Sequence, residues 1–168
     1  FHSHNLPIPD AQNYLTEQAL KNPLTQYVFY IEEDTVPPKD ALEKLFDLDC
    51  DVACIDYGVN GWSCVAKDKE TEEILWCGLG CTLVRRNVFR HLEKPYFRVD
   101  KSLRLNDWKW INTPMKYGGH DIYFFTKIRE AGFEITQLKG EARHLELKDL
   151  GKQGTNNGFH NIVDKPKI

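Results

Sequence analysis

Three consecutive carboxylates, Glu32, Glu33 and Asp34, directly follow an apolar run over residues 27–31 and precede a proline pair. β-Branched and aromatic residues without polar alternation predict a strand covered on both faces, and the prolines end it. Open α/β folds bind ligands at the carboxyl ends of such strands. Glu32 and Asp34 would share one side of an extended chain, where two oxygen donors suit Mg²⁺ or Mn²⁺. The alternative is a solvated acidic turn.

A second candidate group, His120 and Asp121, begins a helical pattern that ends near Gly132. In the first helical turn, the unpaired backbone donors and the helix dipole favour an ionised Asp121. An ionised aspartate at the mouth of a sheet can accept a proton from a substrate hydroxyl. Alternatively, Asp121 only caps the helix.

His144 follows a predicted strand over residues 133–138. Its neutral imidazole could join Asp34 at a metal, or it could be a surface or packing residue. Gly78 and Gly80 lie between two predicted strands and permit close backbone approach to a ligand, or form an ordinary turn.

Five cysteines are an odd count at low density, which favours a reducing compartment over a disulfide framework. Their spacing does not match zinc knuckles, so we interpret them as small buried thiols.

The length of 168 residues predicts one domain over residues 1–150, followed by a polar, glycine-rich and flexible tail over 151–168. Lys and Arg are scattered and the net charge is -3, which argues against nucleic-acid and membrane-binding surfaces.

No apolar run reaches the roughly 18 residues that span a bilayer, and the N-terminus does not resemble a signal peptide. We therefore expect a cytoplasmic protein. The chain does not begin with Met, which suggests a processed or excised piece.

The elements that must position these residues alternate between helical and extended patterns, which predicts an α/β fold with right-handed parallel crossovers. We expect a mainly parallel sheet flanked by helices, with a small antiparallel hairpin inserted. The expected helices cover residues 10–22, a stretch from about 39, and 121–132; the expected strands cover 27–31, 51–56, 81–84 and 133–138, and the hairpin covers 62–66 and 73–77.

Four of these stretches, in this order and spacing, resemble the GT-A glycosyltransferases, closest to family 2. They are the acidic run with its strand and prolines, Gly78-Leu79-Gly80-Cys81-Thr82-Leu83-Val84, Gly119-His120-Asp121 with its helix, and His144. The match covers about residues 5–146 and implies a Rossmann-like GT-A sheet. It also implies transfer of a sugar from a nucleotide-sugar donor to an acceptor hydroxyl, with inversion, on a carbohydrate, lipid or protein acceptor.

The resemblance implies a role for each candidate residue. Asp34 and His144 would bind Mn²⁺ or Mg²⁺ at the donor diphosphate, and Asp121 would act as the catalytic base. The implied donor-binding residues are Glu32, Glu33, Asp34, Gly78 and Gly80, and the implied acceptor-binding residues are Trp62, Trp108, Trp110 and His120. Aromatic faces pack well on sugar rings, although core packing is the alternative for each tryptophan.

Only 31 residues precede Glu32, so the N-terminal β-α-β unit that holds the nucleotide base in this family is missing from the chain. An upstream segment or a second chain would complete the domain, or the protein is a minimal relative. An upstream part could also hold the protein at the cytoplasmic face of a membrane. Two other functions stay open: a non-catalytic nucleotide- or sugar-binding relic of the same fold, and a metal-dependent phosphohydrolase.

Overall fold

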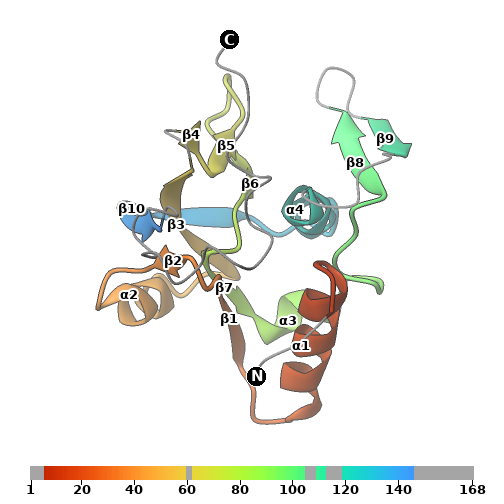
Figure 1. The fold of residues 1–168 in the computed structure, drawn as a ribbon, viewed down its shortest axis with the longest axis horizontal. Coiled ribbons are helices and arrows are strands. Elements are labelled where there is room, and N and C mark those ends of the chain that lie inside the picture. Colours follow the sequence, from red (N-terminus) through yellow and green to blue (C-terminus); the bar gives the residue numbers. More distant parts are fainter. Residues whose placement is uncertain (1–5, 60–61, 105–108, 113–118, 146–168) are drawn as a thin grey trace, which may run out of the picture.

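The computed structural model describes residues 6–59, 62–104, 109–112 and 119–145 (Figure 1). Its helices are α1 (Asp10–Lys21), α2 (Ala41–Asp47), α3 (Arg86–Phe89) and α4 (His120–Glu130). Its strands are β1 (Tyr27–Ile31), β2 (Thr35–Val36), β3 (Val52–Val59), β4 (Trp62–Ser63), β5 (Val65–Lys67), β6 (Ile74–Cys77), β7 (Cys81–Arg85), β8 (Lys101–Arg104), β9 (Lys109–Asn112) and β10 (Ile135–His144).

The main sheet has the strand order β1-β7-β3-β10-β2, with the short β4 paired to β3. Strand β7 runs antiparallel to both of its neighbours, placing Cys81 opposite Ile31 in β1 and Val84 opposite Val52 in β3. The β2–β10 and β3–β4 pairs are also antiparallel. Among the pairs in the described part of this sheet, β3 and β10 alone are parallel. The fold is therefore mixed α/β with a mostly antiparallel sheet.

The prediction of a mainly parallel, Rossmann-like GT-A sheet flanked by helices is thus wrong. Strands β1 and β3 do run in the same direction, as the connection through α2 suggested, but β7 lies between them and runs the opposite way. A strand covered on both faces is apolar whether its neighbour is parallel or antiparallel. The apolar runs in β3 and β7 indicated burial correctly, whereas β1 is only partly buried and its Ile31 is 50% exposed, so the prediction of cover on both faces is wrong for that strand. None of these runs contained information about the direction of β7.

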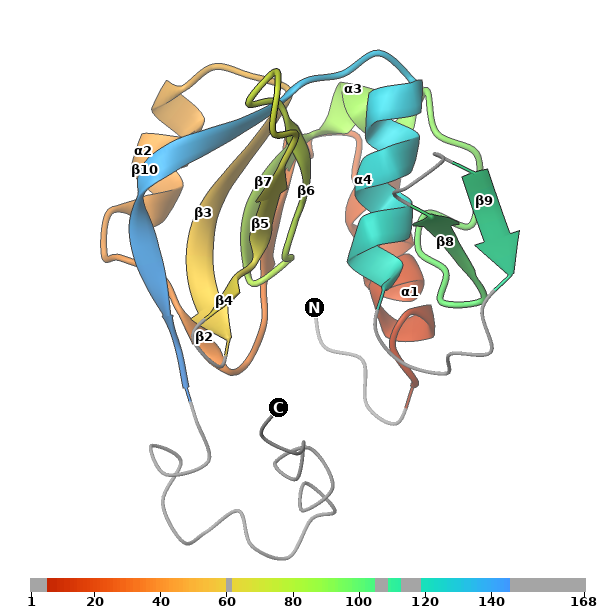
Figure 2. The ribbon, with the colours of Figure 1, turned by 90° about the horizontal axis from the view of Figure 1, so that it is seen from above.

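The sheet curves until it is nearly barrel-like, as Figure 2 shows. Its two outer strands in the main order, β1 and β2, are separated in the chain only by the turn at residues 32–34. The amide of Thr35 donates to the carbonyl of Glu32 across this turn (3.0 Å). The acidic residues therefore span the gap between the two ends of the curved sheet.

Two apolar clusters cover the two faces of the sheet, because alternate residues of β3 point in opposite directions. Val52 and Cys54 face the cluster built with α3 and α4, which includes Phe124 and Phe125. Ala53 and Ile55 face the cluster beneath α2. Figure 2 shows α2 on one side of the sheet and α1, α3 and α4 on the other.

Two small hairpins complete the described chain. The hairpin predicted over 62–66 and 73–77 forms from β5 and β6, whereas Trp62 and Ser63 pair with the end of β3 instead. The β8–β9 hairpin was not expected from the sequence.

No helix in the described ranges is long and apolar enough to cross a membrane. The division at residue 150 stays a prediction, and the tail 151–168 lies outside the described residues.

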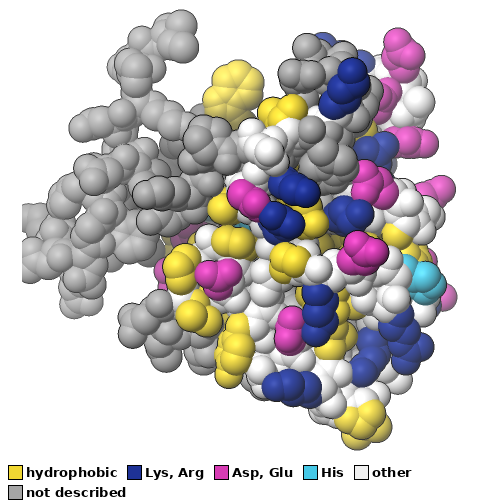
Figure 3. Space-filling model, turned by 90° about the vertical axis from the view of Figure 1, so that its right-hand side faces the viewer, with side chains coloured by type: hydrophobic (Ala, Val, Ile, Leu, Met, Phe, Trp, Pro, Cys, Tyr) yellow, Lys and Arg dark blue, Asp and Glu magenta, His cyan; other side chains and the backbone are white. Residues whose placement is uncertain are grey.

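Figure 3 shows one face of the molecule, on which basic and acidic side chains are interspersed with apolar ones. Neither sign of charge dominates the described part of this face. A mixed surface of this kind does not form the basic stripe that is typical of proteins binding nucleic-acid backbones.

Candidate functional site

Four of the predicted site residues, Glu32, Asp34, Asp121 and His144, form what we call the acidic site. Glu32 and Asp34 lie in the turn after β1, Asp121 lies in the first turn of α4, and His144 is the last residue of β10. The charges of Asp34, Asp121 and His144 all influence the pKa of Glu32, so each of these three side chains lies within electrostatic range of Glu32. The carboxyl ends of β1 and β10 and the start of α4 therefore meet at one end of the sheet.

Asp34 and His144 are brought together by the antiparallel pairing of β2 with β10. This register places His144 directly opposite Thr35. The amide of Leu145 donates to the carbonyl of Asp34 (2.6 Å), which fixes the two backbones side by side. Nε2 of His144 lies 3.3 Å from Oδ2 of Asp34, and the side chains are 20% and 43% exposed. A carboxylate oxygen and an imidazole nitrogen thus lie close together on two partly exposed side chains.

Glu32 lies deeper than Asp34 and has a different electrostatic environment. Burial, followed by the negative charge of Asp34, raises the pKa of the Glu32 carboxyl above its ordinary value. The nearby Asp121 raises this pKa further, while the hydrogen bond from Tyr57 and the charge of His144 lower it. Neighbouring carboxylates create a region of negative potential that favours a cation.

The fit of a divalent cation can be judged from the donors themselves. Asp34 and His144 supply one carboxylate and one imidazole, a set that suits Mn²⁺ and accommodates Mg²⁺. Within the described ranges, no group of three or more His, Cys, Asp or Glu residues could hold a metal ion. Mg²⁺ commonly takes only one or two protein ligands and fills its other positions with phosphate oxygens and water. A cation at this pair would therefore need phosphate oxygens or water as its other ligands.

The start of α4 presents both His120 and Asp121. Gly119 precedes the helix with a left-handed backbone (φ 73°), which a residue without a Cβ adopts readily. Oδ1 of Asp121 accepts a hydrogen bond from the amide of Ile122 (2.8 Å), a contact to a free donor of the first turn. Asp121 therefore accepts a backbone hydrogen bond within the first turn, although Gly119 is the N-cap residue, and its charge also raises the pKa of Glu32.

His120 has a buried Nδ1 with no hydrogen-bond partner among the described residues. Burial lowers the pKa of its imidazole, and the charge of Asp121 opposes that shift. A neutral His120 beside Asp121 can offer one donor and one acceptor to a bound hydroxyl.

Gly78 and Gly80 approach a side chain that the sequence analysis missed, Tyr57. A Cβ added to Gly78 would lie 2.1 Å from the Tyr57 hydroxyl, and one added to Gly80 would lie 2.8 Å from its ring. The second Cβ would also come within 2.6 Å of the buried Oγ1 of Thr35. Contact of either glycine with a donor stays a prediction. Tyr57 lies near the carboxyl end of β3, and applying the rule used for Glu32 to this strand would have indicated it.

The other predicted ligand-binding residues have varied positions. Glu33 is exposed in the turn between β1 and β2. Trp62 lies in β4, paired with the carboxyl end of β3, and is 79% exposed, which excludes core packing for this side chain. Trp110 lies in β9, and Trp108 lies outside the described residues.

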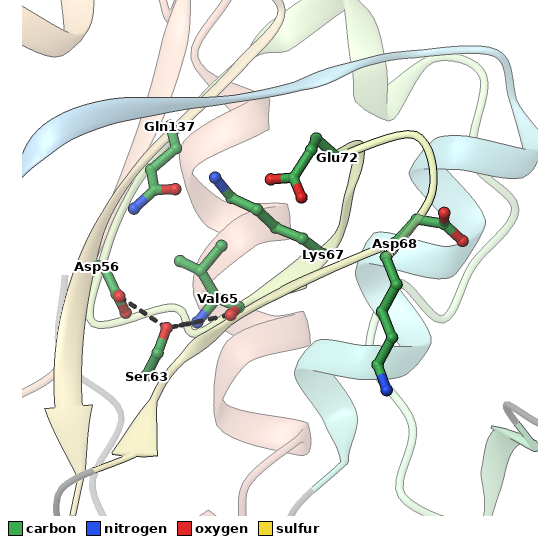
Figure 4. A pocket seen from close by; sticks show the side chains of 8 residues that line it. Asp56, Ser63, Val65, Lys67, Asp68, Glu72 and Gln137 are labelled. Carbon is green, nitrogen blue, oxygen red and sulfur yellow. Dashed lines mark hydrogen bonds between the residues drawn. The ribbon is translucent and has the colours of Figure 1, made fainter.

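Neither of the two cavities described here is lined by a residue of the acidic site. A cavity of ≈ 410 Å³ is lined by residues of β3, β10 and the β5–β6 hairpin, among them Lys67, Glu72 and Gln137 (Figure 4). Asp56 lies at its edge and accepts hydrogen bonds from the Ser63 hydroxyl (2.7 Å) and the Cys64 amide (2.9 Å).

A second cavity of ≈ 920 Å³ follows the same hairpin and shares Lys67, Glu72 and Gln137 with the first. Cys64 donates from its amide to Asp56 at the edge of the first cavity. Burial raises the pKa of its thiol to about 11, helped by the charges of Asp56, Asp121 and Glu32. A thiol with this pKa stays protonated near neutral pH and is a poor nucleophile.

Comparison with known proteins shows the fold and no family. No protein-family model matches the chain, and no curated protein matches it. The crystal structure of A197 from STIV is similar, with a TM-score of 0.61 and 19% sequence identity over 85% of this chain and 69% of that chain. At this level of identity the likeness concerns the fold alone.

Proposed function

We propose that this protein is a metal-dependent glycosyltransferase that moves a sugar from a nucleotide-sugar donor to an acceptor hydroxyl with inversion. The main support is that the four residues of the acidic site lie together at one end of the sheet. Two of them, Glu32 and His144, are far apart in the chain. The proposal rests on this site and on the order of the motifs that resemble family 2, and not on a parallel GT-A sheet.

In the proposed reaction, the carboxylate of Asp121 takes the proton of the acceptor hydroxyl as its oxygen attacks the anomeric carbon. The bond between that carbon and the donor diphosphate breaks on the opposite face of the sugar, and its electron pair leaves with the diphosphate. Asp34 and His144 would hold a Mn²⁺ or Mg²⁺ ion, which supplies positive charge beside the leaving group when bound. Glu32 would face the donor, and the exposed Trp62 would contact an acceptor ring.

The test is a screen for transfer and donor hydrolysis across nucleotide sugars with Mn²⁺, together with calorimetric Mn²⁺ binding. Asp34→Asn should weaken Mn²⁺ binding and lower turnover at least about 100-fold, because it removes the charged metal ligand. Asp121→Asn should keep Mn²⁺ binding but lower transfer about 100-fold or more, the usual scale for losing a general base. Asp47→Asn is the matched control, because Asp47 is an exposed carboxylate at the end of α2.

Turnover that neither Asp34→Asn nor Asp121→Asn changes would overturn the proposal. Nucleotide-sugar binding without any turnover would instead indicate a non-catalytic binding protein. Hydrolysis of simple phosphate esters, abolished by Asp34→Asn, would indicate a phosphohydrolase.

A further inference from the structure

We infer that Tyr57 is the positioning residue of the acidic site, holding the Glu32 carboxyl and the His144 ring in the orientations that the proposed reaction uses. The inference rests on the proposed function and adds to it a residue that does not itself touch the reacting atoms. Tyr57 lies on β3 and is 4% exposed, so substrate does not reach its side chain directly.

The hydroxyl of Tyr57 has a fixed hydrogen-bond direction. The amide of Gly80 donates to the phenolic oxygen (3.1 Å), so this contact uses the oxygen as an acceptor. The phenol's own proton is then directed to Oε2 of Glu32 (3.2 Å). Burial, together with the charge of Glu32, raises the pKa of Tyr57, which keeps the phenol protonated and able to donate. Glu32 is therefore linked through Tyr57 to the backbone that starts β7.

The ring of Tyr57 is held as firmly as its hydroxyl. Gly78 and Gly80 leave no room for a Cβ on the side of the ring that they face. The ring also lies parallel to the imidazole of His144, with 7° between the planes and 6.2 Å between the centroids. A single buried side chain thus contacts the residue expected at the donor and one of the two expected metal ligands.

Simple core packing is the competing explanation, because Tyr57 also belongs to the apolar cluster beneath α2. A phenylalanine would fill that volume equally well, so packing alone does not require the hydroxyl. Positioning of Glu32 does require it. Tyr57→Phe therefore separates the two roles, because the ring beside His144 is retained and only the hydroxyl is lost.

The matched control is Tyr30→Phe. Tyr30 is partly buried, but its hydroxyl is buried and hydrogen-bonded to Oγ1 of Thr16 (2.7 Å), and its ring packs on Phe97 and Phe124. Both substitutions remove one buried hydroxyl, but only Tyr57 bonds to Glu32. A general cost of losing a buried hydrogen bond should appear in both variants.

With Mn²⁺ and the donor found by the screen, we expect Tyr57→Phe to lower kcat/KM about tenfold, which is the scale of one hydrogen bond to a charged group. The loss should appear mainly as a higher KM for the donor, while calorimetric Mn²⁺ affinity changes less than about threefold because His144 keeps its aromatic neighbour. In a Glu32→Gln background, the same substitution should have a much smaller effect, because the two residues act as one unit. Tyr30→Phe should leave the kinetic constants unchanged.

Wild-type kinetics for Tyr57→Phe, or losses that simply add to those of Glu32→Gln, would overturn the inference. Absence of turnover in the wild type would count against the proposed function alone. The positioning role is then decided by crystal structures of the wild type and of Tyr57→Phe. A displaced Glu32 carboxyl would support the inference, and an unmoved one would overturn it.

Discussion

Glu32 and Asp34 are separated by one residue yet occupy different environments. Asp34 is partly exposed beside His144, whereas Glu32 lies deeper and accepts a hydrogen bond from Tyr57. Burial, followed by the negative charge of Asp34, raises the pKa of the Glu32 carboxyl. The two residues therefore suit different tasks: Asp34 can bind an ion that arrives from solvent, and Glu32 is a directed hydrogen-bonding group.

This raised pKa makes the stability of the protein depend on pH. The folded state binds the Glu32 proton more tightly than the unfolded chain, so the associated stabilisation is fully present below the ordinary value of 4.5. It is lost as pH rises through the raised pKa of the folded state. Glu32→Gln removes the ionisation and keeps an acceptor for Tyr57. In metal-free buffer, we expect its Tm to match the wild type near pH 4 and to exceed it at pH 8.

The expected difference at pH 8 is about 2–4 °C for an effect on the order of 1 kcal/mol in a domain of this size. Circular dichroism melts at several pH values measure it. Glu33→Gln changes the neighbouring exposed side chain and should show no such pH-dependent gap. A difference between Glu32→Gln and the wild type that stays constant from pH 4 to 8 would contradict the assignment.

The elements around the site are tied together by backbone contacts that local patterns do not reveal. Arg86, at the start of α3, donates from its guanidinium to the carbonyls of Leu20 (2.7 Å), Asn22 (2.5 Å) and Thr25 (3.1 Å). These carbonyls belong to the end of α1 and to the connection that follows it. Since the last carbonyls of a helix have no partner within the helix, Arg86 completes α1 and holds it beside β1 and β7.

Arg86→Met should therefore destabilise the protein by about 2–4 kcal/mol, because several charge-assisted hydrogen bonds are lost and their acceptors are left without partners. Arg85→Met, at the neighbouring position, is the control. Arg85 pairs with Asp49, whose side chain is 89% exposed, and such surface ion pairs contribute about 0–1 kcal/mol. Urea unfolding of Arg86→Met and Arg85→Met measures both values. Equal losses in the two variants would contradict this role of Arg86.

The whole molecule is organised by one curved sheet with an apolar cluster on each face. Leu45 of α2 is 1% exposed in one cluster, and Ile128 of α4 is fully buried in the other. Both clusters pack on the same strands, so neither can open without exposing the sheet. We therefore expect the described domain to unfold as one cooperative unit, and the acidic site to be lost in the same transition.

Leu45→Ala and Ile128→Ala should each lower the free energy of unfolding by about 2–5 kcal/mol, because each leaves a cavity in a packed cluster. Far-ultraviolet and near-ultraviolet circular dichroism should report a single coincident transition for both variants. Leu42→Ala is the control on the same helix, because Leu42 is 51% exposed, and it should cost much less. Separate transitions for the two clusters would show that the domain is not one unit.

Local patterns in the sequence determined the elements that carry the site. The strand over residues 27–31 has the predicted bounds, and the helix predicted over 121–132 forms over His120–Glu130. Apolar runs indicate which residues tend to be buried, and chain breakers indicate where a helix or strand ends. Both are properties of neighbouring residues, so they can be interpreted without knowing the fold. The same patterns placed Asp34 just after a strand and Asp121 in the first turn of a helix, and the structure has them after β1 and at the start of α4.

Only the tertiary structure decided how these elements pair. It inserted β7 between β1 and β3, placed His144 opposite Thr35, and enclosed Tyr57 between Gly78, Gly80 and His144. Each of these relations joins residues far apart in the chain. Strand partners and their direction depend on the packing of the whole sheet, and a strand covered on both faces has the same sequence pattern in either orientation.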